Sequence, residues 1–561
     1  MKFTGSAWQT RNDSILDKSK SMLEGLINVT LNIQSCIMEI ALCLSGGGYR
    51  ASIFHLGVIS VLNEIKMDDE KVMLDHVHTI TSISGGALTA LLFLLSEIDG
   101  KKRRETIKEI YHKIVDTNIG DLLLEKFDQD SKEGRALIQS LSSIYDEQFF
   151  HGETFGKILN YMSWNGIHHF YADATDFELG LPFRFQATAQ LSTEKRDGQP
   201  YGMVGNWQHG IARDVAMNIK LSDIMAASSC FPIVFEPFIF PDEFSLDEET
   251  RSQTKDIPGG FPLMDGGLID NQGVDPALHA AHHMIDEGRE MDLLLICDAG
   301  NGSSEDADKE WALWKLTPKS IFNILLGMCI IFLVGGIVSI FLSMPLLAGV
   351  LTTLSFVCGV VCYILKWMNN WLCSMITVKT KLQLKGNPIW GSTLRSIGTF
   401  LKSRAISAYR MADAVMSGNQ KKLWFRALNN SPEWKDKLLM NSLSLFSEKK
   451  TWIRIFRRQG LGRELRPKLE MQNTTKKAMK MDTTLWFDEE HKRNGTPKAI
   501  FACGRYTTCW NLLVFIDKLK KIEAAKRNSF QNELIANEDV IANLWNKLQQ
   551  NHYYNSRQYT D

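Results

Sequence analysis

Residues 77–88, VHTITSISGGAL, decide the fold that this sequence predicts. The apolar and β-branched residues from Val77 to Ile83 indicate a buried strand, and leucines at helical spacing from Leu88 onward indicate a helix. Between them, Ser82-Ile83-Ser84-Gly85-Gly86 is typical of a nucleophile elbow, in which a tight strand-to-helix turn presents a serine beside helix N–H groups. Ser82 stands where such a turn usually has glycine. Alone, a small-x-Ser-x-Gly pattern is common in chains of this length.

The sequence around the elbow repeats this strand-to-helix rhythm. An apolar run at 40–44 is followed by apolar residues at helical spacing, and the elbow strand and helix come next. Such alternation predicts an α/β fold in which helices cover a mostly parallel sheet. Further strands are expected at 184–189, 293–297 and 499–503. The last of these follows a long apolar segment, which we therefore interpret as an insertion within one catalytic fold.

A second glycine-rich turn ends the strand expected at 40–44. Its sequence, Leu44-Ser45-Gly46-Gly47-Gly48-Tyr49-Arg50, has three successive glycines, which let the backbone approach a ligand and leave N–H groups free to bind an anion. One interpretation is an oxyanion hole, with Arg50 supporting the loop or binding an anionic head group. A dinucleotide-binding turn is another, but the acidic residue it requires about 20 residues later is missing. A purely structural turn is the third.

Two kinds of residue are candidates for the base that would activate Ser84. Met264-Asp265-Gly266-Gly267 would let a carboxylate approach the serine, but an aspartate with an ordinary pKa of about 3.9 is a poor base at neutral pH, so this role requires burial. Asp-Gly alone is most often a turn. Histidines on an expected helix offer the alternative base of a Ser-Asp-His triad. They are His279, His282 and His283.

The segment between Lys319 and Lys366 contains no charged residue and no histidine. Its apolar stretches 321–342 and 346–365 would each reach roughly 30 Å as helices, about the thickness of the hydrocarbon core of a membrane. The alternative, a buried helical pair in a soluble core, would usually keep a polar face. Ser343-Met344-Pro345 supplies a turn between the stretches. The segment therefore predicts a transmembrane α-hairpin with two membrane-spanning helices.

The flanks of the hairpin predict its orientation. Tryptophans at both ends are typical of the membrane interface, and lysines at both ends place them in the cytoplasm by the positive-inside rule. The catalytic domain is then expected to face the cytoplasm. The flanking tryptophans are Trp311, Trp314, Trp367 and Trp371.

The distribution of charge predicts which partners the chain has. With 63 Lys and Arg against 64 Asp and Glu, a basic coat for nucleic acid is excluded. Residues 366–470, however, hold 21 Lys and Arg against 6 Asp and Glu. We expect this segment to attract anionic lipid head groups at the membrane surface, although a solvated basic face would have the same composition.

Neither a disulfide framework nor a metal site is predicted by the cysteines. The 10 cysteines are scattered, several within apolar runs, as is typical of free thiols in a reducing compartment. Cys358 and Cys362 are one helical turn apart in the apolar segment, where packing explains them. The N-terminus has no apolar stretch of the kind found in a secretory signal.

Taken in order, three motifs resemble those of the patatin-like phospholipases. They are Gly46-Gly47-Gly48-Tyr49-Arg50, the elbow at 82–86, and Asp265-Gly266-Gly267. Ala174-Thr175-Asp176, and the segment 227–232 with Phe235, look like structural landmarks of the same family. The resemblance runs from about 40 to 298 and resumes at 502–506, and it is to a bacterial-type patatin domain carrying an inserted transmembrane hairpin.

This resemblance implies a three-layer, modified α/β-hydrolase fold with a parallel-rich central sheet. It also implies a Ser-Asp dyad without a catalytic histidine, in which Ser84 is the nucleophile and Asp265 its base. Gly46, Gly47 and Gly48, with Arg50, would form the oxyanion hole. The reaction would be acyl transfer from a membrane phospholipid to the serine, followed by hydrolysis to a fatty acid and a lysolipid, with no metal or cofactor.

Two further roles are interpreted beside the dyad. Asp176 is expected to be structural, because buried loop aspartates usually cap or turn the backbone. The stretch 230–235 is a candidate apolar lip for acyl chains, with core packing as the equal alternative.

Five regions follow from these assignments: an N-terminal extension (1–36), the main catalytic part (37–300), the hairpin with its flanks (310–375), a basic juxtamembrane region that returns to the catalytic domain (376–517), and a polar helical tail (518–561). A free lipase would damage its own membrane, so we expect control by a regulatory partner or a homo-oligomer. Two rival functions remain at this point: an inactive scaffold that binds lipid or a partner, and a nucleotide-binding membrane regulator.

Overall fold

The structure is a computed structural model of the chain. It describes residues 38–67, 71–132, 136–162, 166–189, 195–196, 199–200, 204–232, 234–255, 260–286, 288–300, 317–380 and 418–560. Two compact units are distinguished, residues 1–304 with 412–561 and residues 305–411. The expected N-terminal extension, Trp311 and Trp314 lie outside the described residues, as does the basic stretch 381–417.

Twelve strands are described: β1 (Ile40–Leu44), β2 (Val77–Ile83), β3 (His169–Asp176), β4 (Leu181–Thr188), β5 (Lys195–Arg196), β6 (Gln199–Pro200), β7 (Val204–Gly205), β8 (Gly210–Ile211), β9 (Phe238–Phe240), β10 (Phe261–Asp265), β11 (Leu293–Asp298) and β12 (Leu438–Ser442).

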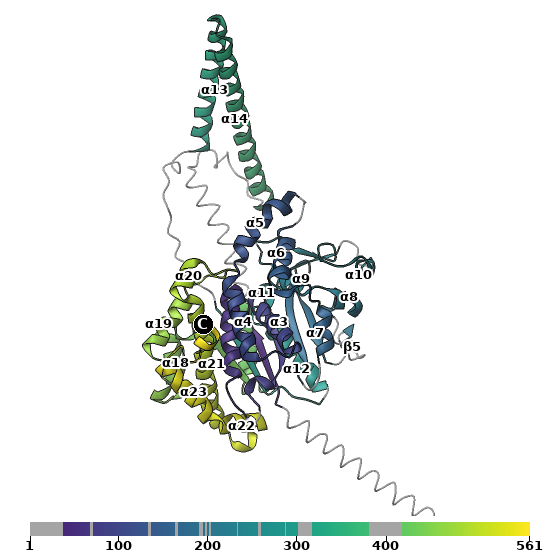
Figure 1. Ribbon diagram of the computed structural model, residues 1–561, viewed down its shortest axis with the longest axis vertical. Helices are drawn as coiled ribbons and strands as arrows, with labels where there is room; N and C mark the ends of the chain where they lie inside the picture. The colour runs from purple at the N-terminus through teal and green to yellow at the C-terminus, as the bar shows by residue number, and fades with distance from the viewer. Residues whose placement is uncertain are drawn as a thin grey trace, which may run out of the picture. The chain divides into compact units, whose positions relative to one another are not determined.

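Helices between and after these strands complete the larger unit (Figure 1): α2 (Gly48–Leu62), α3 (Gly85–Ile98), α4 (Arg103–Asp116), α5 (Ile119–Lys132), α6 (Leu137–Tyr145), α7 (Phe155–Tyr161), α8 (Arg213–Asn218), α9 (Leu221–Ser228), α10 (Glu248–Ser252), α11 (Gly267–Asp270), α12 (Val274–Asp286), α17 (Gly418–Asn430), α18 (Lys449–Gln459), α19 (Leu469–Ala478), α20 (Glu489–Asn494), α21 (Thr496–Lys520), α22 (Ser529–Ala536), α23 (Glu538–Gln550) and α24 (Arg557–Thr560). Short 3₁₀ or π turns are η1 (Met73–His76), η2 (Asp146–Phe150), η5 (Leu443–Phe446), η6 (Arg463–Leu465) and η7 (Ala524–Lys526).

The central sheet is mixed and mostly parallel in its core. Its strands follow the order β12-β11-β1-β2-β3-β4-β7-β8, with β10 paired to β3 and β9 to β10. The run from β12 to β3 is parallel, whereas β4, β7, β8, β9 and β10 pair in antiparallel fashion. The strands expected at 40–44, 77–83, 184–189 and 293–297 are confirmed. This sheet is the parallel-rich α/β arrangement that the sequence predicts.

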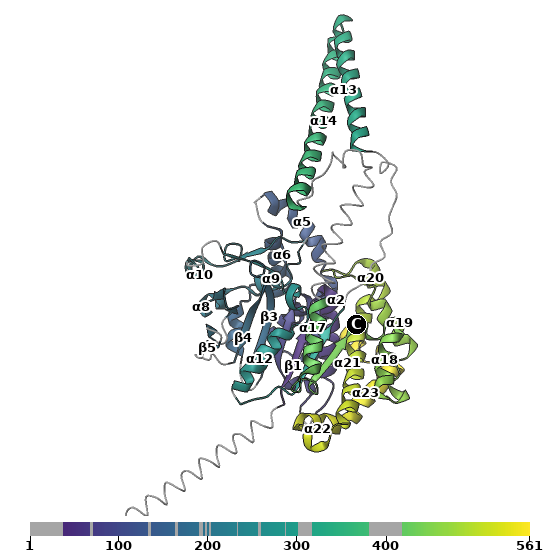
Figure 2. The ribbon, with the colours of Figure 1, turned by 180° about the vertical axis from the view of Figure 1, so that it is seen from behind.

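Helices cover both faces of the sheet. Successive side chains of a strand point to opposite faces, so the all-apolar strand β1 presents an apolar surface on each side that must be covered. Leu42 and Leu44 of β1 belong to a core that includes α2 and α21. Ala41 and Cys43 belong to a second core that includes residues of α12 and α17. Figure 2 shows α12 and α17 on their side of the strands. The result is a helix-sheet-helix arrangement of three layers.

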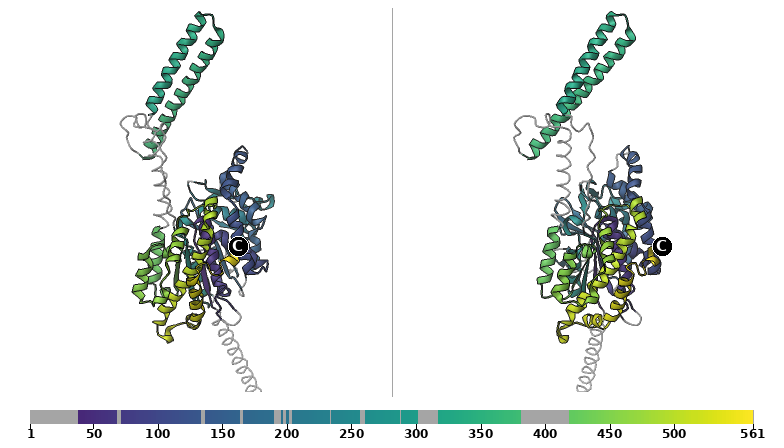
Figure 3. Two further views of the ribbon diagram at one scale, coloured as in Figure 1. Left: turned by 60° about the vertical axis from the view of Figure 1, so that its left-hand side comes forward. Right: turned by 90° about the vertical axis from the view of Figure 1, so that its left-hand side faces the viewer.

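The C-terminal part of the chain completes the larger unit. β12 extends the sheet by pairing with β11, and α21 packs along α2. Figure 3 shows the green to yellow C-terminal helices beside the purple and blue N-terminal part. A Cβ on Gly504 would lie 2.2 Å from the carbonyl oxygen of Phe54, so the two backbones nearly touch. The strand expected at 499–503 is wrong, because these residues lie within α21. A short apolar run has the same composition in a buried helix as in a buried strand.

The last helices also contribute to the core. Trp545 of α23 is 1% exposed, and Phe530 and Leu534 of α22 are fully buried. Residues 518–561 thus combine a polar composition with an apolar stripe that packs on the rest of the unit.

The smaller unit contains the helical hairpin. α13 (Pro318–Phe341) and α14 (Pro345–Thr380) are joined by a short turn in which Ser343 has a positive φ of 57°. The hydroxyl of Ser355 donates a hydrogen bond of 2.9 Å to the carbonyl of Cys329, linking the two helices. Most of their large apolar side chains are exposed, unlike those of a helical pair buried in a core.

Within the part of the chain that the structure describes, three helices are long and apolar enough to cross a membrane. Two belong to the hairpin, at 318–341 and 345–370, with mean hydropathies of 2.8 and 2.1. The third, α21, has a mean hydropathy of 1.3, but its apolar window is 100% buried inside the larger unit. Its apolar character is therefore explained by core packing.

Candidate active site

The sheet brings the elbow serine and Asp265 to neighbouring positions. β4 pairs with β3 along its whole length, from His169 to Asp176, and so occupies one edge of β3. On the other edge, β2 ends with Ile83 opposite Asp173, and antiparallel β10 ends with Asp265 opposite Ala174. Because each strand has only two edges, β2 and β10 meet end to end. Ser84, which follows Ile83, therefore emerges beside Asp265.

The backbone at Ser84 has the strained geometry of a nucleophile elbow. Ser84 has φ 49° and ψ −119°, a conformation that residues with a side chain rarely adopt, and α3 begins at the next residue. The hydroxyl of Ser228 holds the turn by accepting the Ser84 N–H at 2.9 Å and donating to the carbonyl of Asp173 at 2.7 Å. Ser82 fits without glycine because its hydroxyl donates to the carbonyl of Tyr171 at 2.8 Å.

Two helix N-termini meet at the serine. α2 begins at Gly48 and α3 at Gly85, and a Cβ on Gly85 would lie 2.0 Å from the Gly48 carbonyl oxygen. A Cβ on Gly86 would lie 2.2 Å from the carbonyl oxygen of Leu44, so helix and strand also nearly touch. The unsatisfied N–H groups and the dipoles of two helices then create a positive potential beside Ser84. Such a potential favours an oxyanion.

Within the glycine loop, individual N–H groups differ in their partners. The Gly46 N–H donates to the carbonyl of Asn271 at 3.0 Å, and the Tyr49 N–H donates to the carbonyl of Thr484 at 2.9 Å. Gly47 and Gly48, which lie between them, have positive φ values of 138° and 57°. This leaves the Gly47 and Gly48 amides as the better candidates for oxyanion donors.

Arg50 ties the glycine loop to the C-terminal part of the chain. Its side chain is fully buried and donates to the carbonyls of Met481 and Gly300 and, at 3.4 Å, to the hydroxyl of Thr483. These partners show the guanidinium supporting the loop, one of the two roles that the sequence suggests for it. No local pattern in the sequence indicates that residues from beyond the hairpin reach this loop.

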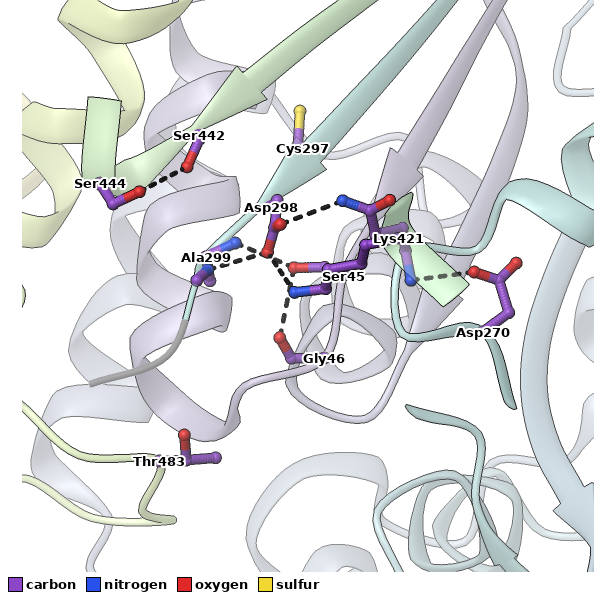
Figure 4. Close-up of polar contacts among 12 residues, drawn as sticks. Ser45, Gly46, Asp270, Cys297, Asp298, Ala299, Lys421, Ser442, Ser444 and Thr483 are labelled. Carbon is purple, nitrogen blue, oxygen red and sulfur yellow. Dashed lines mark hydrogen bonds and ion pairs between the residues drawn. The ribbon is translucent and has the colours of Figure 1, made fainter. Parts of the chain in front are cut away.

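A polar network underlies the loop from the other side (Figure 4). The hydroxyl of Ser45 accepts the Ala299 N–H at 3.0 Å and donates to the Gly46 carbonyl at 3.2 Å. Asp298, at the end of β11, forms an ion pair with Lys421 at 3.0 Å and accepts a hydrogen bond from Gln272 at 3.0 Å. Although Asp298 is buried, Lys421 and these hydrogen bonds lower its pKa. Asp298 therefore joins β11, α17 and the loop before α12.

Asp265 is buried, as its proposed role requires. The residue is 6% exposed; its Oδ1 accepts the Gly267 N–H at 2.7 Å, and its own N–H donates to the Cys230 carbonyl at 2.9 Å. Nearby, the hydroxyl of Tyr145 lies 3.1 Å from that of Ser229. Burial raises the pKa of Tyr145, and the charge of Asp265 raises it further. Tyr145 thus stays a neutral hydroxyl close to the carboxylate.

The histidines considered as alternative bases have other contacts. His279 Nδ1 lies 3.3 Å from the hydroxyl of Tyr171, and the ring of His283 packs against those of His279 and His169. Burial lowers the pKa of His279 to about 2. His282 is exposed on the same helix. The described contacts of His279 and His283 therefore belong to the packing of α12 on the sheet.

Asp176 has the structural role that was expected for it. Its Oδ1 accepts the Leu179 N–H at 3.1 Å, and its Oδ2 accepts a bond from the Asn206 amide at 3.0 Å and lies 2.6 Å from His209 Nδ1. The carboxylate therefore fixes the turn after β3 to the loop between β7 and β8.

Apolar side chains border the strand that ends at Asp265. Val234 is 57% exposed and Phe177 is 52% exposed, whereas Phe235 is buried. The Phe177 N–H donates to the Pro262 carbonyl of β10 at 2.9 Å. The stretch 230–235 thus combines a buried anchor with an exposed tip, and Ile233 lies outside the described residues.

One group of side chains has the composition of a metal site, at the opposite end of the parallel strands. Glu39, His78 and His168 bring one ligand atom each within 4.8 Å of one another. However, Arg289 already donates to the Glu39 carboxylate, and the two imidazoles stack with an interplanar angle of 2°. Parallel stacked rings cannot both hold one ion in their planes, so the arrangement fits a buried ion-pair network better.

Residues 42–278 match the model of a protein family described as patatin-like phospholipase. The matched range contains the glycine loop, the elbow, Asp176 and Asp265, but not the hairpin or the C-terminal helices. A search of the curated proteins found no match.

Proposed function

Because residues 42–278 form a patatin-like phospholipase domain, we propose that this chain is a membrane-anchored serine lipid acyl hydrolase. It would cleave the fatty acyl esters of glycerophospholipids through Ser84 and Asp265. The observation that carries this proposal is the end-to-end meeting of β2 and β10, which aligns the elbow serine with a buried carboxylate.

In the proposed mechanism, Asp265 takes the proton of the Ser84 hydroxyl as its oxygen attacks the ester carbonyl of the lipid. The Gly47 and Gly48 amides would stabilise the negative charge that develops on the carbonyl oxygen. Asp265 returns this proton to the lysolipid oxygen, which leaves as an alcohol, and the acyl chain stays on Ser84. Water then attacks the acyl-enzyme by the same route and releases the fatty acid.

Neither the fold nor the loop geometry favours the nucleotide-binding rival. The Gly46 N–H is engaged with Asn271, and Thr484 crosses the loop, where a Cβ on Gly48 would lie 2.4 Å from the Thr484 carbonyl oxygen. A dinucleotide-binding turn needs this space for a pyrophosphate group. The inactive-scaffold rival predicts that the wild-type protein releases no fatty acid in an activity assay.

The test is fatty-acid release from phosphatidylcholine vesicles by the full chain. We expect Ser84→Ala and Asp265→Asn each to abolish release while the protein stays folded. Ser96→Ala is a matched control, because Ser96 lies on the same helix α3 and the one described hydrogen bond of its hydroxyl goes to the Leu92 carbonyl at 3.1 Å. Full activity in either site variant would refute the dyad, and no activity in the wild type on any phospholipid would favour the scaffold.

We also propose that the hairpin anchors the enzyme, with two transmembrane helices and the catalytic unit facing the cytoplasm. The exposed apolar surface of α13 and α14 supports this, since it would otherwise contact water. Deleting residues 321–365 should move the protein to the soluble fraction with its hydrolase unit intact. Tight membrane association of the deletion variant would count against the two spans.

Residues 366–470 are further proposed to contact anionic head groups, and a regulatory partner or a homo-oligomer to control activity. The described part of this segment includes α17 and α18, which carry exposed Lys and Arg side chains. At the membrane surface each such residue contributes about 1 kcal/mol of attraction to anionic lipid.

A further inference from the structure

A basic cleft lies outside the site described above, among α18, η6, α19 and α23. Its volume is about 690 Å³, within the range of about 300–1,000 Å³ that is typical of ligand pockets. None of the described residues that line it is acidic. Five of them are basic: Lys449, Arg463, Arg466, Lys468 and Lys476.

Within the described contacts, the basic side chains of this cleft are not joined to carboxylates, although Glu448, Glu464 and Glu470 are their neighbours in the chain. No ion pair among the described residues joins any of the five side chains to a carboxylate, and all five are exposed. Elsewhere in the C-terminal part, Lys437 and Lys518 do pair, with Glu290 and Asp436. Like charges held around one cleft repel each other, and a bound anion would relieve that repulsion.

The wall that carries the arginines is fixed by buried residues. Trp510 Nε1 donates to the Leu465 carbonyl at 2.8 Å, and Trp545 Nε1 donates to the Glu464 carbonyl at 3.0 Å. The amide of Gln549 donates to the Arg466 carbonyl at 2.9 Å. The backbone of residues 463–466 is thus held by helices of the core, which prepares the arginines to bind a ligand in a defined position.

One buried polar group in the cleft lacks a partner. Trp452 lines the cleft and is 2% exposed, yet its Nε1–H has no hydrogen-bond acceptor among the described residues. Leaving a buried donor unsatisfied costs about 1–3 kcal/mol, so such groups usually have an acceptor. This Nε1 has less than 1 Å² of exposed surface, so a ligand oxygen could reach it only after the side chains around it move.

We propose that this cleft binds a ligand that carries phosphate groups, either a free polyphosphate anion or the phosphate of a lipid head group. Arginine forks and lysine ammonium groups are the side chains that recognise phosphate oxygens in proteins. The cleft offers both.

Binding at the cleft is connected to the glycine loop through α19. This helix carries Lys476 in the cleft and ends at Ala478, three residues before Met481 accepts its bond from Arg50. A ligand that orders α19 should therefore also order the Thr484 carbonyl that accepts the Tyr49 N–H. That this connection regulates activity rests on the proposed hydrolase function. Ligand binding and amide hydrogen exchange are measured without catalytic turnover, so they test the cleft separately from that function.

The experiment compares two charge-matched double variants of the full chain in detergent. Arg463→Gln with Lys476→Gln removes two charges from the cleft, whereas Arg457→Gln with Arg458→Gln removes two exposed charges of α18 that do not line it. Tripolyphosphate binding is measured by calorimetry. Binding to phosphatidylcholine vesicles, with and without phosphatidic acid, is measured by sedimentation. For this assay residues 321–365 are also deleted from both double variants, so that insertion of the hairpin does not dominate the binding to vesicles.

We expect the cleft variant to lose at least about tenfold in affinity, as the loss of one charge-assisted hydrogen bond would cause, and the surface variant to change little. If the cleft variant binds tripolyphosphate more weakly, the ligand is a free anion. If it is weakened only in binding to phosphatidic acid vesicles, the ligand is a lipid head group. Equal losses in both variants, or no binding of either probe, would overturn the site. Binding that leaves amide exchange at Tyr49 unchanged would overturn the connection to the glycine loop.

Discussion

Replacing Gly85 with alanine should damage the active site more than the addition of one methyl group usually does. The added Cβ would lie 2.0 Å from the Gly48 carbonyl oxygen and 2.7 Å from its carbonyl carbon, and real Cβ atoms essentially never come closer than 3.0 Å to such atoms. The elbow helix and the glycine loop must therefore separate by at least about 1 Å. Overpacking of this kind costs about 1–3 kcal/mol of stability, and a displacement of about 1 Å at a reaction centre costs about 100-fold in rate.

This prediction is tested by measuring kcat for fatty-acid release together with the unfolding temperature. Gly418→Ala is the matched control, because a Cβ on Gly418, at the start of α17, meets nothing within 4 Å and the residue has no positive φ. We expect Gly85→Ala to lose about 100-fold in kcat while most of the protein stays folded, and Gly418→Ala to resemble the wild type. A Gly85→Ala enzyme with unchanged rate would refute the close approach of the two helix N-termini.

Further predictions concern the surroundings of the site and the hairpin. Arg50→Gln should destabilise the chain by about 3 kcal/mol in denaturant unfolding, since two carbonyls lose a charged donor, and should lower kcat without altering head-group preference. Burial raises the pKa of Asp270 from 3.8 to about 6, so its contribution to stability is complete below pH 3.8 and is lost as the pH rises through about 6. The stability of Asp270→Asn should therefore fall less than that of the wild type over this range, and an identical pH profile would contradict the assignment. Ser343→Cys, in the turn of the hairpin, should react with a membrane-impermeant maleimide on intact cells, and labelling only after lysis would reverse the proposed orientation.

Local patterns were sufficient to predict the elbow and its strand. Residues 77–88 combine a β-branched run, a Ser-x-Gly turn and a helical leucine pattern, and each depends only on neighbours in the chain. The glycine loop was predictable for the same reason. The sequence shows that Ser82 replaces the usual glycine of the elbow. It does not show how the serine side chain fits there, because the carbonyl that accepts its hydroxyl belongs to β3.

Pairings between distant parts of the chain were not predictable. That β10 runs antiparallel and abuts the end of β2 depends on how β3 extends beyond its neighbour, and no short pattern encodes this. The support of Arg50 by Met481 joins residues on opposite sides of the hairpin. The error at 499–503 has a related cause, because every residue of α21 from Ala499 to Ile516 is buried, which removes the apolar-polar periodicity that distinguishes helix from strand.

Labelling with a fluorophosphonate probe, followed by mass-spectrometric mapping, tests most directly whether the Ser84 oxygen is activated by its neighbouring carboxylate. We predict a covalent adduct at Ser84 in the wild-type protein, no adduct there in Ser84→Ala, and much slower labelling of Ser84 in Asp265→Asn. Labelling of a different residue, or labelling of Ser84 at the same rate with and without the Asp265 carboxylate, would contradict the proposed dyad.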